Sequence, residues 1–227
     1  MQLPKTVYQL EKPDRHLMGG VILLPGATGN SLKDSRYNLL SGALTKKGFC
    51  FLRLALWKNP AELNRLCLND IYTTLDSAIA KLEAEGCNHI GLVGKSLGGG
   101  VLLTYNSFKV NAMVVWAPAI GADYRIEDPS DSESTVHAMR QKKFSELQSL
   151  QDIKINKKDL KKIRCPVLLI QGTDDVFVKR ENSIKIYRAL PNARMRYISG
   201  AGHSYEKKHE ISEVVSETVS FFTENLK

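Results

Sequence analysis

The sequence predicts an α/β fold, a doubly wound and mostly parallel sheet with helices on both faces. Short segments that are almost entirely apolar recur along the chain, as expected of strands covered on both sides. Longer stretches with apolar residues at helical spacing alternate with them, and this alternation favours parallel strands joined by helices. The chain has 227 residues, so we expect residues 1–227 to form a single domain with a sizeable core.

Five segments are predicted to be core strands, because each is a short run of mainly apolar residues. In chain order they are GVILLP (20–25), FCFLRLAL (49–56), HIGLVG (89–94), AMVVWAP (112–118) and PVLLIQG (166–172). A sixth, shorter candidate is RMRYISG (194–200), and KTVYQLEK (5–12) is predicted to be an antiparallel edge strand.

Two helices are predicted from the spacing of apolar residues. Asn59 provides a capping side chain and Pro60 suits the first helical position. Gly86 is expected to end this helix, whose buried face is marked by Leu63, Leu66, Ile71, Leu75, Ile79 and Leu82. The same spacing recurs near the C-terminus at Ile211, Val214, Val215, Thr218, Phe221 and Phe222.

A long polar segment, residues 121–164, interrupts the alternation of strands and helices. Its apolar residues are spaced in a way that predicts partial helix, and a connection of this length usually forms a lid or cap over a site. We therefore expect a helical lid insertion at 121–164.

Composition argues against several classes of function. No apolar run approaches the roughly 18–20 residues needed to cross a membrane. The N-terminus, MQLPKTVYQLEKPDRH, lacks the features of a secretory signal, so we expect a soluble, cytoplasmic protein. No metal site is expected, because the four cysteines form no CxxC pair and have no histidine pair nearby. They are Cys50, Cys67, Cys87 and Cys165, of which the first, third and fourth lie in or beside apolar segments and are expected to be buried free thiols.

The formal net charge of +8 is concentrated between Arg140 and Arg164. Only Phe144 is interleaved with these basic residues, which favours a solvated surface over a nucleic-acid interface. We expect no nucleic-acid partner.

The segment GLVGKSLGGG (91–100) contains GKS, yet it does not fit a nucleotide-binding loop. That loop requires GxxxxGK[ST], and the position of its first glycine is held by His89. The segment fits G-x-S-x-G instead, in which the chain turns sharply from strand to helix with Ser96 at the tip. Gly94 and Gly98 would then avoid a clash, and Gly99 and Gly100 would let the helix approach the sheet closely.

A serine hydroxyl needs a base and an orienting carboxylate before it can act as a nucleophile. In this topology they follow in the order Ser, Asp or Glu, His, at the carboxyl ends of later strands. The strand at 166–172 is followed by Asp174 and Asp175, and the strand at 194–200 by His203. His203 is the best base, His209 on the last helix is the reserve, and either aspartate suits the orienting role.

These motifs together resemble the α/β-hydrolase family, in particular its small esterases, lipases and dienelactone-hydrolase-like members. The similarity runs from about Val21 to Phe222 and is clearest in GKSLGG, IRCPVLLIQGTDDVFV and LPNARMRYISGAGHSY. The resemblance implies a nucleophile at Ser96 and a base at His203. It also selects Asp175, because the acid of the family usually lies three residues after the glycine that ends its strand.

The resemblance further implies an oxyanion hole made of two backbone N–H groups. One belongs to the residue after the nucleophile, Leu97. The other comes from the loop after an early strand, where relatives often have HGxxG and this chain has PGATG at 25–29. Ala27 is then the second donor, and the proline that replaces histidine leaves the main-chain donor in place.

We expect a serine hydrolase that acts on small-molecule substrates, cleaves carboxylic esters or related acyl compounds, and needs no cofactor. Since free histidine titrates near 6.5, the activity of the enzyme is expected to fall below about pH 6–7. Acyl-thioesterase, acyltransferase and peptidase activities remain alternatives on the same fold. The peptidase is disfavoured, because 227 residues leave no room for the accessory domain of many fold-related peptidases. A non-catalytic binding protein on this scaffold is the alternative from another class.

Overall fold

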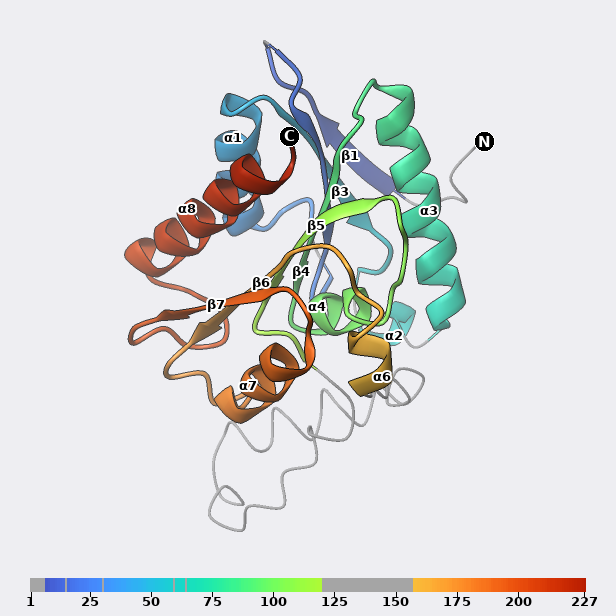
Figure 1. The fold of residues 1–227 in the computed structure, drawn as a ribbon. Helices are drawn as coiled ribbons and strands as arrows, with labels where there is room; N and C mark the ends of the chain where they lie inside the picture. The colour runs from blue at the N-terminus through green and yellow to red at the C-terminus, as the bar shows by residue number, and fades with distance from the viewer. Residues whose placement is uncertain (1–6, 15, 30, 59, 64, 120–156) are drawn as a thin grey trace.

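A computed structural model of the chain describes residues 7–14, 16–29, 31–58, 60–63, 65–119 and 157–227. Their strands form a seven-stranded sheet of order β1-β3-β2-β4-β5-β6-β7 (Figure 1). Most of the expected lid, residues 121–156, lies outside the described residues. The remainder, 157–164, includes the short helix α6 (Lys157–Leu160).

Every predicted strand is present. The strands are β1 (Val7–Glu11), β2 (Gly19–Leu24), β3 (Phe49–Ala55), β4 (Ile90–Lys95), β5 (Val110–Trp116), β6 (Val167–Gly172) and β7 (Ala193–Ile198). β1 runs antiparallel to β3, and all other neighbouring pairs are parallel, which confirms the mostly parallel sheet and its antiparallel edge. The carboxyl ends of β2 to β7 therefore share one edge of the sheet.

Helices cover both faces of this sheet, as predicted for a doubly wound fold. The helices α1 (Ser35–Lys46) and α8 (Lys208–Asn225) pack side by side on one face (Figure 1). The opposite face carries α6 together with α2 (Pro60–Leu63), α3 (Leu68–Ala84), α4 (Leu97–Leu102) and α7 (Arg180–Ala189). None of the described helices combines the length and apolar character required for a membrane crossing.

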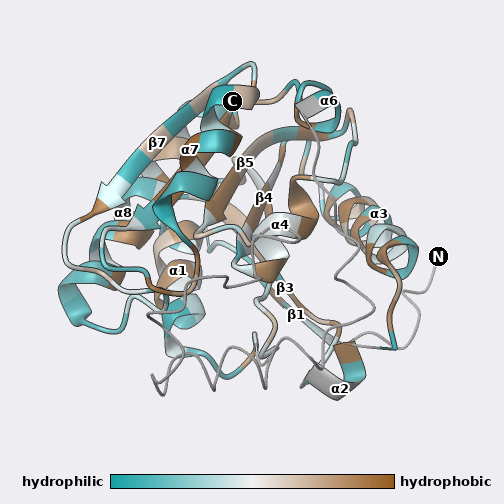
Figure 2. Cartoon of the chain, turned by 90° about the horizontal axis from the view of Figure 1, so that it is seen from below, coloured by the Kyte–Doolittle hydropathy of each residue, from teal (hydrophilic) through white to brown (hydrophobic). Residues whose placement is uncertain are grey.

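The two faces of the sheet have separate hydrophobic cores. Along β4, Ile90 and Leu92 belong to the core beneath α3, whereas Val93 belongs to the core beneath α1 and α8. This alternation follows from the period of two in a strand, and burial on both sides explains why the central strands are apolar throughout. Figure 2 shows β4 and β5 mainly in hydrophobic colours and the edge strand β7 with hydrophilic segments.

The long helix predicted to begin at Asn59 and end at Gly86 is two helices instead. The second, α3, begins only at Leu68, after Cys67 in an extended conformation. The side chain of Asp70 accepts a hydrogen bond from the Cys67 N–H at 2.8 Å, which satisfies a backbone donor at a new helix N-terminus. Apolar spacing on both sides of this break is nearly continuous, so periodicity alone did not reveal it.

The glycines after Ser96 allow α4 to lie against the sheet edge, as the sequence predicted. A Cβ atom at Gly98 would lie 2.4 Å from the carbonyl oxygens of Leu24 and Pro25, and one at Gly100 would lie 1.8 Å from the carbonyl oxygen of Ala119. These contacts involve backbone atoms, which cannot rotate away as a side chain would. Any larger residue must therefore displace α4.

We predict opposite effects for alanine at two helical glycines. Gly100→Ala should destabilise the fold by about 3 kcal/mol or more, because the methyl group overlaps the Ala119 carbonyl. The matched control is Gly42→Ala in the exposed part of α1, where nothing lies within 4 Å of the added Cβ. It should stabilise the protein by up to about 1 kcal/mol through helix propensity. Urea denaturation measures both, and equal effects would contradict the close approach of α4.

Candidate active site

Ser96 lies at a strained turn between β4 and α4. Its backbone has φ 52° and ψ −117°, a conformation that non-glycine residues rarely adopt. The surrounding backbone holds the strain: the Ser96 N–H donates to the Trp116 carbonyl at 2.8 Å, and the Ala119 N–H donates to the Ser96 carbonyl at 2.9 Å. Both partners lie at the end of β5 or just after it, so the sheet itself presents the serine side chain.

His203 joins Ser96 to Asp175. The His203 Nε2 atom lies 3.0 Å from Ser96 Oγ, and His203 Nδ1 lies 2.8 Å from Asp175 Oδ2. An ionised carboxylate can only accept, so Nδ1 carries the proton and Nε2 is free to accept the hydrogen of the serine hydroxyl. The structure thus brings together the three side chains that the sequence selected.

The alternative acid and the alternative base, Asp174 and His209, lie outside this hydrogen-bond chain. Asp174 is exposed, and its Oδ1 accepts a hydrogen bond from Thr173 Oγ1 at 2.9 Å. His209 is exposed on α8. The geometry therefore favours Asp175 and His203 over their neighbours.

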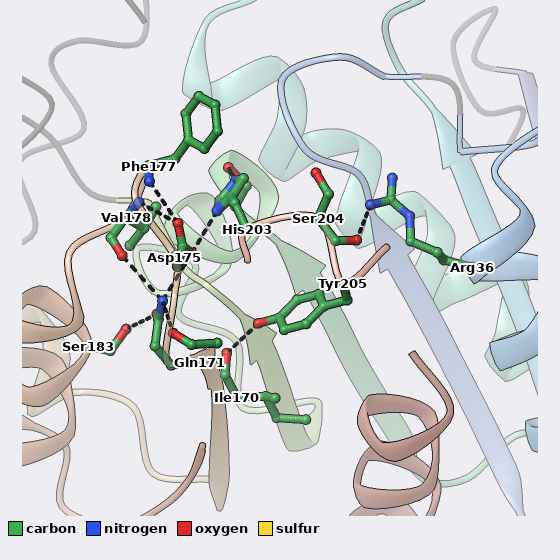
Figure 3. A network of polar contacts seen from close by, with 12 residues as sticks. Arg36, Ile170, Gln171, Asp175, Phe177, Val178, Ser183, His203, Ser204 and Tyr205 are labelled. Carbon is green, nitrogen blue, oxygen red and sulfur yellow. Dashed lines mark hydrogen bonds and ion pairs between the residues drawn. The ribbon is translucent and has the colours of Figure 1, made fainter. Parts of the chain in front are cut away.

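The Asp175 carboxylate is completely buried and accepts four hydrogen bonds. Its Oδ1 accepts from the backbone N–H groups of Phe177 and Val178, at 2.8 and 2.9 Å. Its Oδ2 accepts from His203 and also from Gln171 Nε2 at 3.0 Å (Figure 3). These donors fix both the ionisation state and the direction of the carboxylate.

Gln171 is a residue of this site that the sequence analysis did not identify. It lies on β6, is completely buried, and accepts a hydrogen bond from Ser183 Oγ at 2.6 Å through its own Oε1 (Figure 3). With Oε1 held by Ser183, the amide nitrogen must point to Asp175 and to the Val178 carbonyl, 3.2 Å away. A polar residue inside an otherwise apolar strand was the signal available in the sequence.

The turn that carries His203 is anchored on both sides. Arg36 Nη1, from the first turn of α1, donates to the Ser204 carbonyl at 2.5 Å, and its guanidinium also pairs with Asp34. The Tyr205 hydroxyl donates to the Ile170 carbonyl at 3.0 Å from a completely buried side chain (Figure 3). The residues after His203 thus connect α1 with β6, which limits movement of the imidazole.

Nearby charges and burial set the ionisation states of Asp175 and His203. Burial alone would raise the pKa of Asp175, but the His203 interaction and the two backbone donors outweigh it and hold the pKa below its usual value. Burial lowers the pKa of His203, Asp175 opposes this, and the cations Lys95 and Arg36 add to the lowering, so the net pKa lies below 6.5. The imidazole is therefore neutral at pH 7.

The two candidate oxyanion donors flank Ser96. Leu97 is the first residue of α4, and the N–H groups of a first helical turn have no partner within the helix. Ala27 follows Gly26 in the loop after β2, and a Cβ atom built on Gly26 would lie 3.5 Å from Ser96 Cβ. The loop thus lies directly against the serine.

The described residues hold no cluster of three His, Cys, Asp or Glu side chains suited to a metal ion. The four cysteines are free: Cys50 and Cys87 are buried, Cys165 is partly buried, and Cys67 is exposed. Burial and the adjacent Cys50 raise the pKa of Cys87 to about 12, which makes this thiol a poor nucleophile.

Several solved structures share the fold of this chain. Est1E from Butyrivibrio proteoclasticus superposes with a TM-score of 0.76 at 17% identity, over 96% of this chain and 93% of that one. A dienelactone hydrolase from Anabaena variabilis gives 0.71 at 19% identity, over 100% and 95%. Mouse α/β-hydrolase domain-containing protein 10 gives 0.74 at 18%, over 98% and 96%. At these identities the similarity concerns the fold.

The chain belongs to the prolyl oligopeptidase family, whose sequence model matches residues 61–227. The matched region includes Ser96, Asp175 and His203. No curated protein matched the sequence. Membership of this family confirms the α/β-hydrolase resemblance and supports hydrolase activity.

We predict that hydrolase activity persists below the pH at which free histidine titrates. Only a neutral imidazole can accept a proton, so kcat/KM should fall as the pH drops through the lowered pKa of His203, with its midpoint below about 6.5. Arg36→Met removes one of the cations that lower this pKa and should move the midpoint to higher pH. pH–rate profiles of the wild type and of Arg36→Met test the direction of both shifts. A wild-type midpoint above 6.5 would contradict the lowered pKa of His203.

Removal of the Gln171 amide should weaken catalysis. Gln171→Leu deletes one donor to the Asp175 carboxylate, and hydrogen bonds to charged groups are worth about 1.5–3 kcal/mol, so we expect kcat to fall by about tenfold to a hundredfold. Asp174→Asn is the matched control, because it changes an exposed carboxylate beside Asp175 and should alter kcat less than about twofold. Steady-state kinetics measures kcat for both variants. Equal kcat values for Gln171→Leu and Asp174→Asn would contradict a role of Gln171 in holding Asp175.

Proposed function

We propose that this protein is a serine hydrolase that cleaves carboxylic esters or related acyl compounds through an acyl-enzyme. The observation that supports this most strongly is the continuous hydrogen-bond chain from Ser96 Oγ through His203 to the buried Asp175 carboxylate. Such a chain supplies a base for the hydroxyl and a counter-charge for the imidazolium that forms.

In the first half-reaction Ser96 Oγ attacks the carbonyl carbon, and its proton passes to His203 Nε2. The carbonyl oxygen becomes an oxyanion, for which the N–H groups of Ala27 and Leu97 are the proposed donors. His203 then gives its proton to the leaving alcohol as the C–O bond breaks, which leaves the acyl group on Ser96.

In the second half-reaction water replaces the alcohol. Its oxygen attacks the acyl carbon while His203 takes one proton, and the same proton returns to Ser96 Oγ when the acid departs. Asp175 remains ionised throughout, because its four donors stabilise the charged form. The proposed reaction needs no group other than water.

Several structural neighbours are enzymes named for ester or lactone substrates, which favours an ester substrate for this protein. Est1E has been solved with ferulic acid bound, and a monoacylglycerol lipase from Paleococcus ferrophilus and a dienelactone hydrolase share the fold. The prolyl oligopeptidase family favours a second candidate, a peptide bond. Both substrates contain an acyl carbon that Ser96 can attack, so the choice depends on the pocket and the leaving group.

Labelling with a fluorophosphonate tests the nucleophile. We expect one adduct on Ser96 in the wild-type protein and none in Ser96→Ala, with ester hydrolysis reduced about a millionfold in that variant. Ser212→Ala, an exposed serine on α8, should be labelled like the wild type. Intact-protein and peptide mass spectrometry locate the adduct. A wild-type protein that resists labelling would instead support a non-catalytic binding protein.

A substrate panel separates the two candidate bonds. We expect turnover of p-nitrophenyl esters, with an optimum in acyl chain length that measures the pocket, and little turnover of a proline p-nitroanilide. Ser96→Ala is the control for each substrate. If kcat/KM for the anilide exceeded that for every ester, the protein would be a peptidase.

A further inference from the structure

The loop after β2 contacts the nucleophile through Gly26. A Cβ atom at this position would lie 3.4 Å from the Lys95 carbonyl oxygen and 3.5 Å from Ser96 Cβ. The backbone of Gly26 is therefore packed directly against the turn that carries the serine. Any rotation of its two peptide groups would change which polar atoms face the hydroxyl of Ser96.

The carbonyl group of Gly26 is held by two donors. Trp57 Nε1 donates to it at 3.1 Å, and the Gly29 N–H donates to it at 2.9 Å. Trp57 follows β3 and is completely buried, so its indole nitrogen has no access to water and depends on this acceptor. Loss of the indole N–H would leave only the local turn bond from Gly29.

The geometry of the peptide bond extends this restraint to Ala27. The Gly26 carbonyl and the Ala27 N–H belong to one planar trans peptide and point in opposite directions. A carbonyl directed at Trp57 therefore sets the direction of the Ala27 N–H. Within the described residues, this N–H donates to no protein group, which leaves it available to a ligand.

We propose that Trp57 is a positioning residue for the oxyanion hole, which holds the Gly26–Ala27 peptide so that the Ala27 N–H is directed at the acyl oxygen before substrate binds. This inference rests on the proposed function. It assigns a catalytic consequence to a side chain that would otherwise count only as core. Preorganised donors are effective because they need no reorientation as the charge develops.

A pure packing role predicts different behaviour from a positioning role. Loss of packing lowers stability without a selective effect on the transition state. Loss of donor orientation weakens binding of the oxyanion, so kcat and the affinity for a tetrahedral analogue should fall together while KM changes little. Since Trp57 takes no part in proton transfer, the pH–rate profile should keep its midpoint.

The test uses Trp57→Phe in the full chain, which keeps an aromatic ring and removes the indole N–H. The probe is an alkyl trifluoromethyl ketone, to whose carbonyl carbon Ser96 Oγ adds while its proton passes to His203. We expect kcat for the best p-nitrophenyl ester and the affinity for this ketone to fall in parallel by about tenfold to a hundredfold.

Tyr105→Phe is the control, because it removes a different buried polar group, a hydroxyl that donates to Asp76 Oδ1 at 2.5 Å. It should lower the melting temperature, yet leave kcat and ketone affinity unchanged. If Trp57→Phe fails to fold, 3-benzothienylalanine at position 57 replaces it, because this isostere of tryptophan keeps the bicyclic ring and lacks the N–H.

Two negative results have different meanings. Variants that lose stability but bind the ketone and turn over ester like the wild type would overturn the positioning role and leave the proposed hydrolase intact. A wild-type protein that neither reacts with fluorophosphonate nor binds the ketone would overturn the proposed function, and this inference with it.

Discussion

The hydrogen bond between His203 Nδ1 and the buried Asp175 carboxylate is the interaction on which the rest of the site depends. It connects the ends of β6 and β7 and leaves Nε2 directed at Ser96, on the turn after β4. A carboxylate without access to water must be satisfied by protein donors, and here two backbone N–H groups, an amide and the imidazole supply them. The same donors keep the carboxylate ionised and oriented toward His203.

Several mostly buried side chains near this bond use their polar ends to hold the residues of the site in position. Gln171 holds the carboxylate, Arg36 and Tyr205 hold the turn that bears His203, and Trp57 holds Gly26 beside the serine. Except for the bond from Gln171 to Asp175, four residues further along the chain, each bond joins segments distant in the sequence. The supporting layer is built from helices and strands that are themselves packed into the two cores, so the positions of the reactive atoms depend on the rigidity of the whole sheet edge.

Local residue types made some features of the fold predictable and left others hidden. Strands such as β4 and β6 were predictable because burial on both faces requires apolar residues at every position. The turn at Ser96 was predictable because only glycine tolerates the approach of α4 to backbone atoms. The break before α3 was missed, since a local bond between Cys67 and Asp70 ends the continuity that the apolar spacing suggested.

The sequence by itself determined which strands form, where the serine turn lies, and which aspartate and histidine follow the strand ends, because these depend on local residue types and on chain order. Tertiary structure alone decided the supporting contacts. Arg36 reaches the Ser204 carbonyl, Tyr205 reaches the Ile170 carbonyl, and Trp57 reaches Gly26 only once the strands have taken their order in the sheet. Their roles come from direction and burial, which one-dimensional patterns do not encode.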